Sequence, residues 1–138
     1  MKAMAADGEA KISMTGGCHC GGVRFRVRAA RDQPVVRCTC SICRMTAYLH
    51  LIVPAADFVL ERGAELLTEY RFGTRTARHL FCRICGVKSF YHPRSHPDGV
   101  SVNARCLDPG QHRPAREIPF DGANWEEAAA AGGLDGLA

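Results

Sequence analysis

The chain has 138 residues, enough for one compact domain and too few for two of ordinary size. With 46% hydrophobic and 23% charged residues it has the composition of a globular protein, which excludes a largely disordered or fibrous chain. The formal net charge of +4 counts every cysteine as neutral. Seven thiolates on two zinc ions would lower it to about +1, so the charge alone does not indicate a polyanionic partner.

Eight cysteines are the most informative part of the composition. The sequence has no apolar run long enough for a signal peptide or a membrane span, so we expect a cytoplasmic protein with no membrane partner. In that reducing compartment, dense cysteines indicate metal binding or catalysis rather than disulfides. The oligomeric state is not indicated.

Short alternating runs predict a mostly β fold of antiparallel strands. Apolar and basic residues alternate over 23–28, as on a strand with one buried face. Further short strands are predicted at 48–53, 58–60, 66–72, 87–91 and 100–103. Breakers stand between them at Pro54, Gly63, Gly73 and Pro93.

A short helix is predicted near the C-terminal end. Asn124 can cap it, Glu127 occupies the capping-box position three residues later, and Trp125 begins an alanine-rich stretch. We therefore divide the chain into a flexible N-terminus (1–12), a single zinc-binding domain (13–131) and a flexible C-terminal tail (132–138).

Two pairs of cysteines predict one closed structural zinc site. On a strand, Cys18 and Cys20 would point to the same face, close enough for both sulfurs to reach one ion. Cys82 and Cys85 have zinc-knuckle spacing, and Gly86 suits a positive φ after the second ligand. Together the pairs supply the four ligands of a tetrahedral zinc. The alternative is that all four are reduced cysteines packed in the core.

A second cluster, Cys38, Cys40 and Cys43, has three sulfurs within six residues and no fourth cysteine nearby. Catalytic zinc usually has three protein ligands and one open position. Three thiolates make zinc a weak activator of water and suit it to binding a thiol as thiolate. We therefore predict that these cysteines hold a catalytic zinc. The following Arg44 either meets a substrate carboxylate or is a solvated surface residue.

The alternative for the second cluster is a closed structural site with a fourth protein ligand. Cys106 is the nearest rival, although a single cysteine is more often a small core residue. The histidines considered as ligands or polar neighbours are His79, His92 and His96.

With both cysteine groups placed, the chain resembles the glutathione-dependent formaldehyde-activating enzyme family, which includes the centromere protein V relatives. The resemblance is carried in order by the segments 17–22, 38–44, 81–86, 91–99 and 124–126. It implies a β-tent fold of antiparallel sheets, pinned by a structural zinc on Cys18, Cys20, Cys82 and Cys85. It also implies a second zinc on Cys38, Cys40 and Cys43.

The family reaction joins glutathione to formaldehyde as S-(hydroxymethyl)glutathione. The resemblance therefore implies a zinc-dependent carbon-sulfur lyase or synthase that acts on adducts of glutathione, or another small thiol, with formaldehyde or a related aldehyde. A neighbouring acid would protonate the adduct oxygen. The polar candidates for that role are Arg94, His96, Asn103 and Arg105.

Two other functions remain open at this stage. The first is a noncatalytic zinc-stabilised β-tent module that binds a protein or a small ligand, with the second cluster closed or empty. The second is nucleic-acid binding through Arg24, Arg26 and Arg28 on one strand face. Phe25 should point to the opposite face, so these arginines lack the stacking platform that nucleic-acid binding needs, and a solvated face is the better interpretation.

Overall fold

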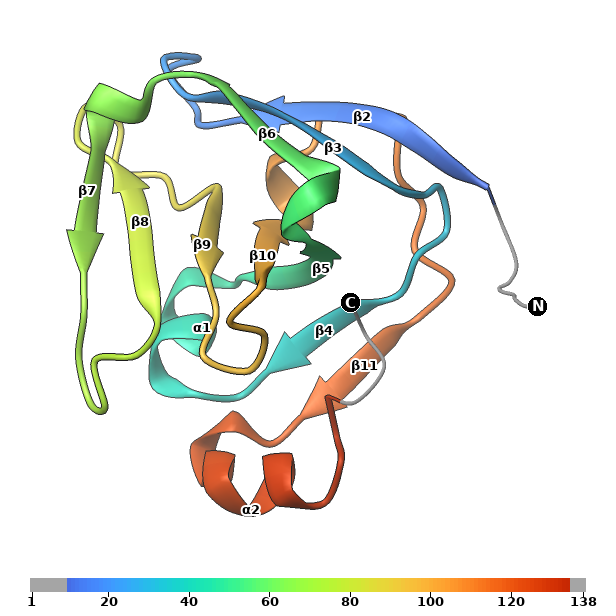
Figure 1. Ribbon diagram of the computed structural model, residues 1–138, viewed down its shortest axis with the longest axis vertical. Helices are drawn as coiled ribbons and strands as arrows, with labels where there is room; N and C mark the ends of the chain where they lie inside the picture. Colours follow the sequence, from blue (N-terminus) through green and yellow to red (C-terminus); the bar gives the residue numbers. More distant parts are fainter. Residues whose placement is uncertain (1–9, 135–138) are drawn as a thin grey trace.

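The computed structural model describes residues 10–134 (Figure 1). Its strands form two sheets, one of seven strands in the order β11-β4-β5-β10-β9-β8-β7 and one of three in the order β2-β3-β6. The strands are β2 (Lys11–Gly17), β3 (Arg24–Ala30), β4 (Val35–Cys38), β5 (Leu49–Pro54), β6 (Phe58–Arg62), β7 (Leu67–Tyr70), β8 (Arg78–Cys82), β9 (Phe90–His92), β10 (Gly99–Asn103) and β11 (Glu117–Phe120).

Short helices connect and extend these strands. The α-helices are α1 (Ser41–Thr46) and α2 (Trp125–Ala130), and the 3₁₀ turns are η1 (Ala55–Asp57), η2 (Ala64–Leu66), η3 (Ala104–Cys106) and η4 (Gly122–Asn124). The expectation of a mostly β protein with a short C-terminal helix is confirmed. None of the helices within residues 10–134 is long and apolar enough to cross a membrane.

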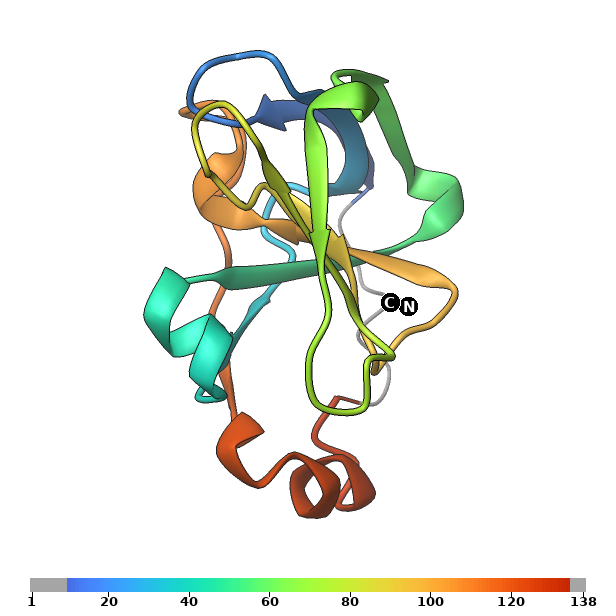
Figure 2. The same ribbon diagram turned by 90° about the vertical axis from the view of Figure 1, so that its left-hand side faces the viewer.

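The small sheet lies across one end of the large sheet, at the top of Figure 1, and Figure 2 shows the same crossing from the side. The core fills the space between the two sheets, and β3 shows why. Phe25 and Val27 are fully buried, whereas Arg26 and Arg28 between and beyond them are exposed. The period-two pattern at 23–28 therefore orients one face inward, as expected.

Aromatic rings join the sheets across this core. The ring of Phe90 on β9 lies 6.2 Å from that of Phe25 on β3 and 4.8 Å from that of Phe58 on β6, measured between centroids. Such pairs stabilise a core beyond the area that they bury, by about 0.5–1.5 kcal/mol each.

The order of pairing differs in one place from an all-antiparallel arrangement. β11 pairs parallel with β4, so that Phe120 lies opposite Cys38. This pairing brings the C-terminal part of the chain, with α2, beside the second cysteine cluster (Figure 1).

Helix α2 begins at Trp125 as predicted, but the expected capping box does not form. The Asn124 side chain caps no backbone N–H of α2; its amide donates instead to Asp121 at 2.9 Å. The preceding 3₁₀ turn ends at Asn124, so the chain already turns before the helix starts and the side chain is held by Asp121.

The chain ends predicted to be flexible (1–12 and 132–138) lie mostly outside the described residues. Within them, Lys11 and Ile12 belong to β2 and pair with Ala30 and Ala29. Leu134 packs beside Phe120.

Candidate metal centres and the adjoining cavity

The two cysteine pairs predicted to share a metal meet between the sheets. Cys18 and Cys20, with Cys82 and Cys85, form what we call the four-cysteine group, whose sulfur atoms all lie within 4.8 Å of one another. The sulfur of Cys20 lies 3.6 Å from that of Cys18 and 3.7 Å from that of Cys82. Sulfurs at the corners of a tetrahedral zinc site, with Zn–S of about 2.3 Å, are about 3.8 Å apart. The four-cysteine group therefore fits zinc.

The local route to this group differs from the expected strand. β2 ends at Gly17, and Cys18 and Cys20 lie in the turn that leads into β3. This turn, rather than strand alternation, brings the two sulfurs together. On the other side, Cys82 ends β8, and Gly86 has the positive φ (78°) expected after the second knuckle ligand.

The four-cysteine group joins the small sheet to the large one. Cys20 and Cys82 are 62 positions apart in the chain, and one lies beside β3 while the other lies on β8. A metal held by both restricts the unfolded chain in the way that a crosslink does. A metal in this group would thus stabilise the fold, and its four cysteines would leave no coordination position free for a substrate.

The second cluster lies at the junction of β4 and α1. Cys38 ends β4, Cys40 is the residue before α1, and Cys43 lies in the first turn of α1. We call these residues the three-cysteine group; their sulfurs also lie within 4.8 Å of one another. No fourth cysteine of residues 10–134 belongs to it. Soft thiolate donors at this separation fit zinc with one position left for another ligand.

Gly122 is packed directly against the three-cysteine group. A Cβ at this position would lie 2.2 Å from Cys38 Sγ, 2.8 Å from Cys40 N and 2.9 Å from Cys40 Cβ. All three separations are shorter than real contacts of a Cβ, so only glycine fits here without a shift. The C-terminal segment therefore forms the back of the group.

Without a metal, the thiols of the three-cysteine group share one negative charge. Hydrogen bonds from Cys38 and Cys43 lower the pKa of Cys40 to about 2. The hydrogen bond to Cys40, together with burial, raises the pKa of Cys38, and hydrogen bonds to Cys38 and then Cys40, together with burial, raise the pKa of Cys43. A second or third ionisation in this small volume is opposed by charge repulsion, which a divalent cation would remove.

A histidine that the sequence analysis did not consider lies against this group. His50 is on β5 and is 5% exposed, and its Nε2 is 3.1 Å from Cys43 Sγ. Burial, and then the charge of Lys88, lowers the pKa of His50 to about 3, so the imidazole is neutral. Nδ1 lies 2.9 Å from the hydroxyl of Ser101 and 3.3 Å from that of Tyr91. We assign the proton to Nε2, where it can donate to Cys43.

The position of His50 explains why it was missed. Its segment, 48–53, was correctly predicted to be a strand that enters the core, and a histidine in such a strand carries no spacing signal. Only the pairing of β5 with β4 and β10 places it beside Cys43 and Ser101.

The other proposed ligands lie elsewhere. Cys106 belongs to neither cysteine group and donates weakly from its thiol to the Lys88 carbonyl at 3.9 Å. His79 lines the cavity described below without belonging to the three-cysteine group, whereas His92 and His96 do not line it.

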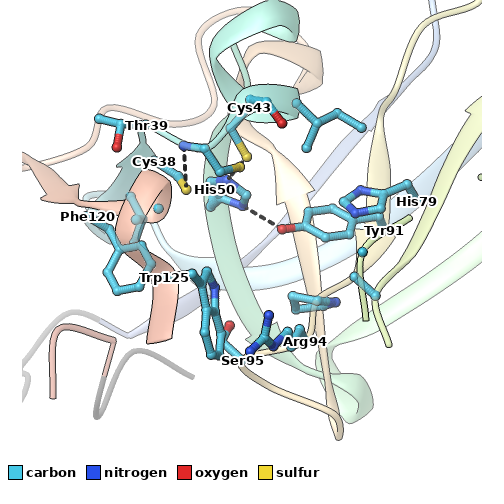
Figure 3. Close-up of a pocket in the computed structure, with 18 of the residues that line it drawn as sticks. Cys38, Thr39, Cys43, His50, His79, Tyr91, Arg94, Ser95, Phe120 and Trp125 are labelled. Atoms are coloured by element: carbon cyan, nitrogen blue, oxygen red, sulfur yellow. Dashed lines mark hydrogen bonds between the residues drawn. The ribbon is translucent and has the colours of Figure 1, made fainter. Parts of the chain in front are cut away.

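The three-cysteine group forms part of the wall of a cavity of about 520 Å³. Figure 3 shows Cys38, Cys43 and His50 on one side, with Trp125 and Arg94 opposite them. The remaining walls come from the loop after β7, from β8 and β9 and from the segment 120–134. Large apolar lining residues are Ile52, Phe72, Phe120, Trp125 and Leu134.

The charged residues that line this cavity are two arginines, Arg44 and Arg94, and no described acidic residue lines it. The Arg94 guanidinium lies over the Trp125 ring, 3.7 Å from its centroid, and pairs with Glu126. Stacking and pairing hold this guanidinium in place while leaving it exposed to the cavity. Arg44 and Arg94 are therefore the lining groups that can meet an anionic ligand, and Glu126 already offsets part of the charge of Arg94.

The four residues considered as proton donors do not gather at this site. Arg94 alone among them lines the cavity. Asn103 is buried and accepts from the Arg105 backbone N–H at 3.1 Å, while the Arg105 side chain donates to the Ala47 carbonyl at 2.7 Å. His96 lies 2.9 Å from the Ser95 hydroxyl. Asn103 and Arg105 thus have structural partners.

The arginines of β3 are paired with carboxylates. Arg24 binds Asp108 through both guanidinium NH groups, Arg26 pairs with Glu61 at 3.1 Å, and Arg28 pairs with Asp57 at 3.5 Å. The basic strand face is therefore neutralised within the molecule.

The chain matches known proteins over most of its length. The family model described as "Glutathione-dependent formaldehyde-activating enzyme" matches residues 13–121. The chain belongs to the glutathione-dependent formaldehyde-activating enzyme family. A protein of Halomonas elongata, provisionally named as such an enzyme, is 33% identical over 113 residues, which cover 76% of this chain and 72% of that protein.

A solved structure supports the fold. The crystal structure of a Rhodobacter sphaeroides protein is 38% identical and superimposes with a TM-score of 0.64, covering 75% of this chain and 99% of that one. The segment that matches the formaldehyde-activating family contains both cysteine groups and ends at Asp121. Helix α2, with Trp125, follows this segment.

Proposed function

We propose that the chain is a zinc-dependent enzyme of the carbon-sulfur lyase or synthase type. Its substrates would be adducts of glutathione, or another small thiol, with formaldehyde or a related aldehyde. The observation that carries the proposal is the three-cysteine group, which opens on a cavity of about 520 Å³ lined by two arginines and no described carboxylate. The family membership and the name of the Halomonas elongata relative support the same reaction.

Zinc on Cys38, Cys40 and Cys43 would offer one open position and favour the thiolate form of a thiol placed there. The protein contributes the surroundings of that position. His50 donates a hydrogen bond to Cys43 and thereby holds its sulfur in place. The apolar walls formed by Phe72, Phe120 and Trp125 limit the water around the thiolate, which strengthens its attraction to nearby positive charge.

The two arginines fit the remaining part of such a substrate. Glutathione carries two carboxylates, and Arg44 and Arg94 both line the cavity. In the forward direction the thiol sulfur forms a bond to the aldehyde carbon, the carbonyl π bond breaks, and the proton released by the thiol ends on the new hydroxyl. The reverse reaction breaks the same C–S bond and returns the aldehyde and the thiol.

The test compares two cysteine variants. Metal analysis of the wild-type protein should find about two zinc ions per chain. Cys43→Ser should retain one zinc and the fold but lose binding of glutathione and turnover of its formaldehyde adduct. The matched control, Cys106→Ser, changes a thiol outside both groups and should keep both metals and the activity.

Two results would contradict the proposal. Full turnover in Cys43→Ser would show that the three-cysteine group takes no part in the reaction. One zinc per chain in the wild type, with no thiol-dependent chemistry, would favour a noncatalytic module that binds a ligand or a partner.

A further inference from the structure

A buried lysine lies over the tyrosine rings that pack with Cys43. Lys88 follows the zinc knuckle and is only 8% exposed, and its Nζ has no hydrogen-bond partner among the described residues. No described carboxylate lies within ion-pair distance of it. Its backbone is held in place, because its carbonyl accepts a hydrogen bond from the Asn103 amide at 3.1 Å. An ammonium group in such a position needs a compensating negative charge nearby.

Two tyrosine rings hold the Lys88 side chain. Its Nζ lies 3.5 Å from the centroid of the Tyr91 ring and 4.1 Å from that of the Tyr48 ring. Both rings pack in one cluster with Cys43, and this cluster extends to Cys38 and Cys40. The aromatic faces attract a cation, but their contribution is smaller than the cost of burying an ammonium ion.

The negative charge that faces Lys88 comes from the cysteines. Burial lowers the pKa of Lys88 to about 7, and the charges of Cys43 and Cys40 act in the opposite direction. Three thiolates around a divalent ion carry a net charge of −1, the sign that Lys88 requires. The other titratable groups that face its side chain are the imidazoles of His50 and His79 and the phenols of Tyr48 and Tyr91. None of these four supplies a negative charge, because burial favours the neutral form of each.

We propose that the Lys88 ammonium is the internal counter-cation of the three-cysteine group, and that it promotes binding of the substrate thiol as a thiolate. The inference rests on the proposed function, because it assigns Lys88 to the same thiol site. Lys88 does not line the cavity, so it is a positioning residue that acts through its charge rather than through contact with substrate.

The role of this charge is greatest when the substrate binds. A fourth thiolate would bring the centre to a net charge of −2, and the ammonium offsets one of those charges. Removing it should therefore weaken thiolate binding more than it weakens metal binding. An opposite charge within about 4–6 Å shifts a pKa by about 1–3 units, and we expect the lower value here because Lys88 Nζ contacts the rings of Tyr48 and Tyr91, which in turn pack with Cys43.

The experiment replaces the lysine by a neutral side chain of similar length. Lys88→Met should still bind about two zinc ions, but its dissociation constant for glutathione at pH 7 should rise about tenfold. The pH at which half of the bound thiol is ionised should rise by about one unit. Calorimetry of the zinc-loaded protein gives the affinity, and the thiolate absorption of the cobalt-loaded protein gives the pH profile. Lys11→Met is the matched control, because Lys11 is an exposed residue at the start of β2 and its replacement should leave both values unchanged.

A second pair of variants covers the case in which Lys88→Met does not fold. Lys88→Gln should show the same loss of thiolate binding, and Lys88→Arg should restore part of it because the charge returns. The inference is overturned by wild-type affinity and pH profile in Lys88→Met or Lys88→Gln, or by equal losses in the glutamine and arginine variants. If the wild-type protein itself binds no thiol, the proposed function is refuted. Failure of the function therefore shows in the wild type, whereas failure of this inference shows only in the Lys88 variants.

Discussion

Gly122 offers the sharpest test of how the three-cysteine group is built. In Gly122→Ala, the added methyl group would meet Cys38 Sγ at 2.2 Å and the backbone nitrogen of Cys40 at 2.8 Å. Ordinary contacts of these atoms are longer than 3.4 Å, so Cys38 would have to move by more than 1 Å. Neither neighbour is the end of a flexible side chain, because one is a proposed metal ligand and the other is backbone.

The expected magnitude follows from this overlap. Overpacking a close site by one methyl group costs about 1–3 kcal/mol of stability. A displacement of one ligand by this amount also exceeds the variation of about 0.2 Å that metal–ligand distances tolerate. We therefore expect Gly122→Ala to remain folded, to lose about 1–3 kcal/mol and to bind the second zinc at least tenfold more weakly.

The assay is a competition with a chromophoric zinc chelator, combined with chemical denaturation. Gly110→Ala provides a control of similar cost, since Gly110 has φ of 87° and a Cβ there would meet nothing within 4 Å. That variant should lose about 1 kcal/mol through backbone strain and keep both zinc ions.

Retention of the second zinc at wild-type affinity in Gly122→Ala would refute this account of the group. Equal zinc loss in Gly110→Ala would refute it as well, because the effect would then follow general destabilisation rather than the contact with Cys38.

Two further predictions concern the fold and the acid response. Cys82→Ser should leave the chain largely unfolded, because a structural zinc on this buried cysteine would hold β8 to the turn after β2. Circular dichroism should then show lost β structure, and a cooperative transition near that of the wild type would contradict a structural zinc. Burial and then the charge of Lys88 lower the pKa of His79 from 6.5 to about 4. Below pH 6.5 the unfolded chain therefore takes up a proton at His79 that the folded chain does not, and the free energy of unfolding falls. His79→Phe keeps a ring stacked between Phe72 and Tyr91. Urea denaturation should show that this variant loses about 1 kcal/mol less stability than the wild type between pH 6.5 and 5.5. The same loss of stability in both proteins would argue against this role of His79.

The sequence predicted those strands whose hydrophobic pattern can be recognised within the segment itself. Alternation at 23–28 and the apolar runs later assigned to β5, β6, β7, β9 and β10 were recognised because each segment carries its own apolar pattern between breakers. β2, β4, β8 and β11 were not recognised. β4 and β11 are four residues long and are stabilised by each other, so their pairing depends on segments about 80 residues apart. A short strand of that kind has no signal of its own in a single sequence.

The sequence predicted the part of the site that depends on the spacing of cysteines along the chain. The seven cysteines fall into two groups of four and three, as expected, because ligand spacing is a local property. The residues around the cysteines were not predictable. His50 comes from β5, Lys88 from the segment after the knuckle, and Gly122 from the turn before α2. Each is an ordinary residue in its own segment and gains its role only when the sheets place it beside the cysteines. Of the polar residues proposed beforehand, Arg44, His79 and Arg94 line the cavity.

The parallel pairing of β11 with β4 also sets an order of assembly. During synthesis, the three cysteines of the second group leave the ribosome long before Gly122, Trp125 and Leu134, which form its back and one wall of the cavity. In the newly made chain, these thiols therefore stand open to solvent, oxidants and competing metal ions until β11 and the segment after it dock. The elements that shield the three cysteines are thus synthesised about 80 residues after the cysteines themselves.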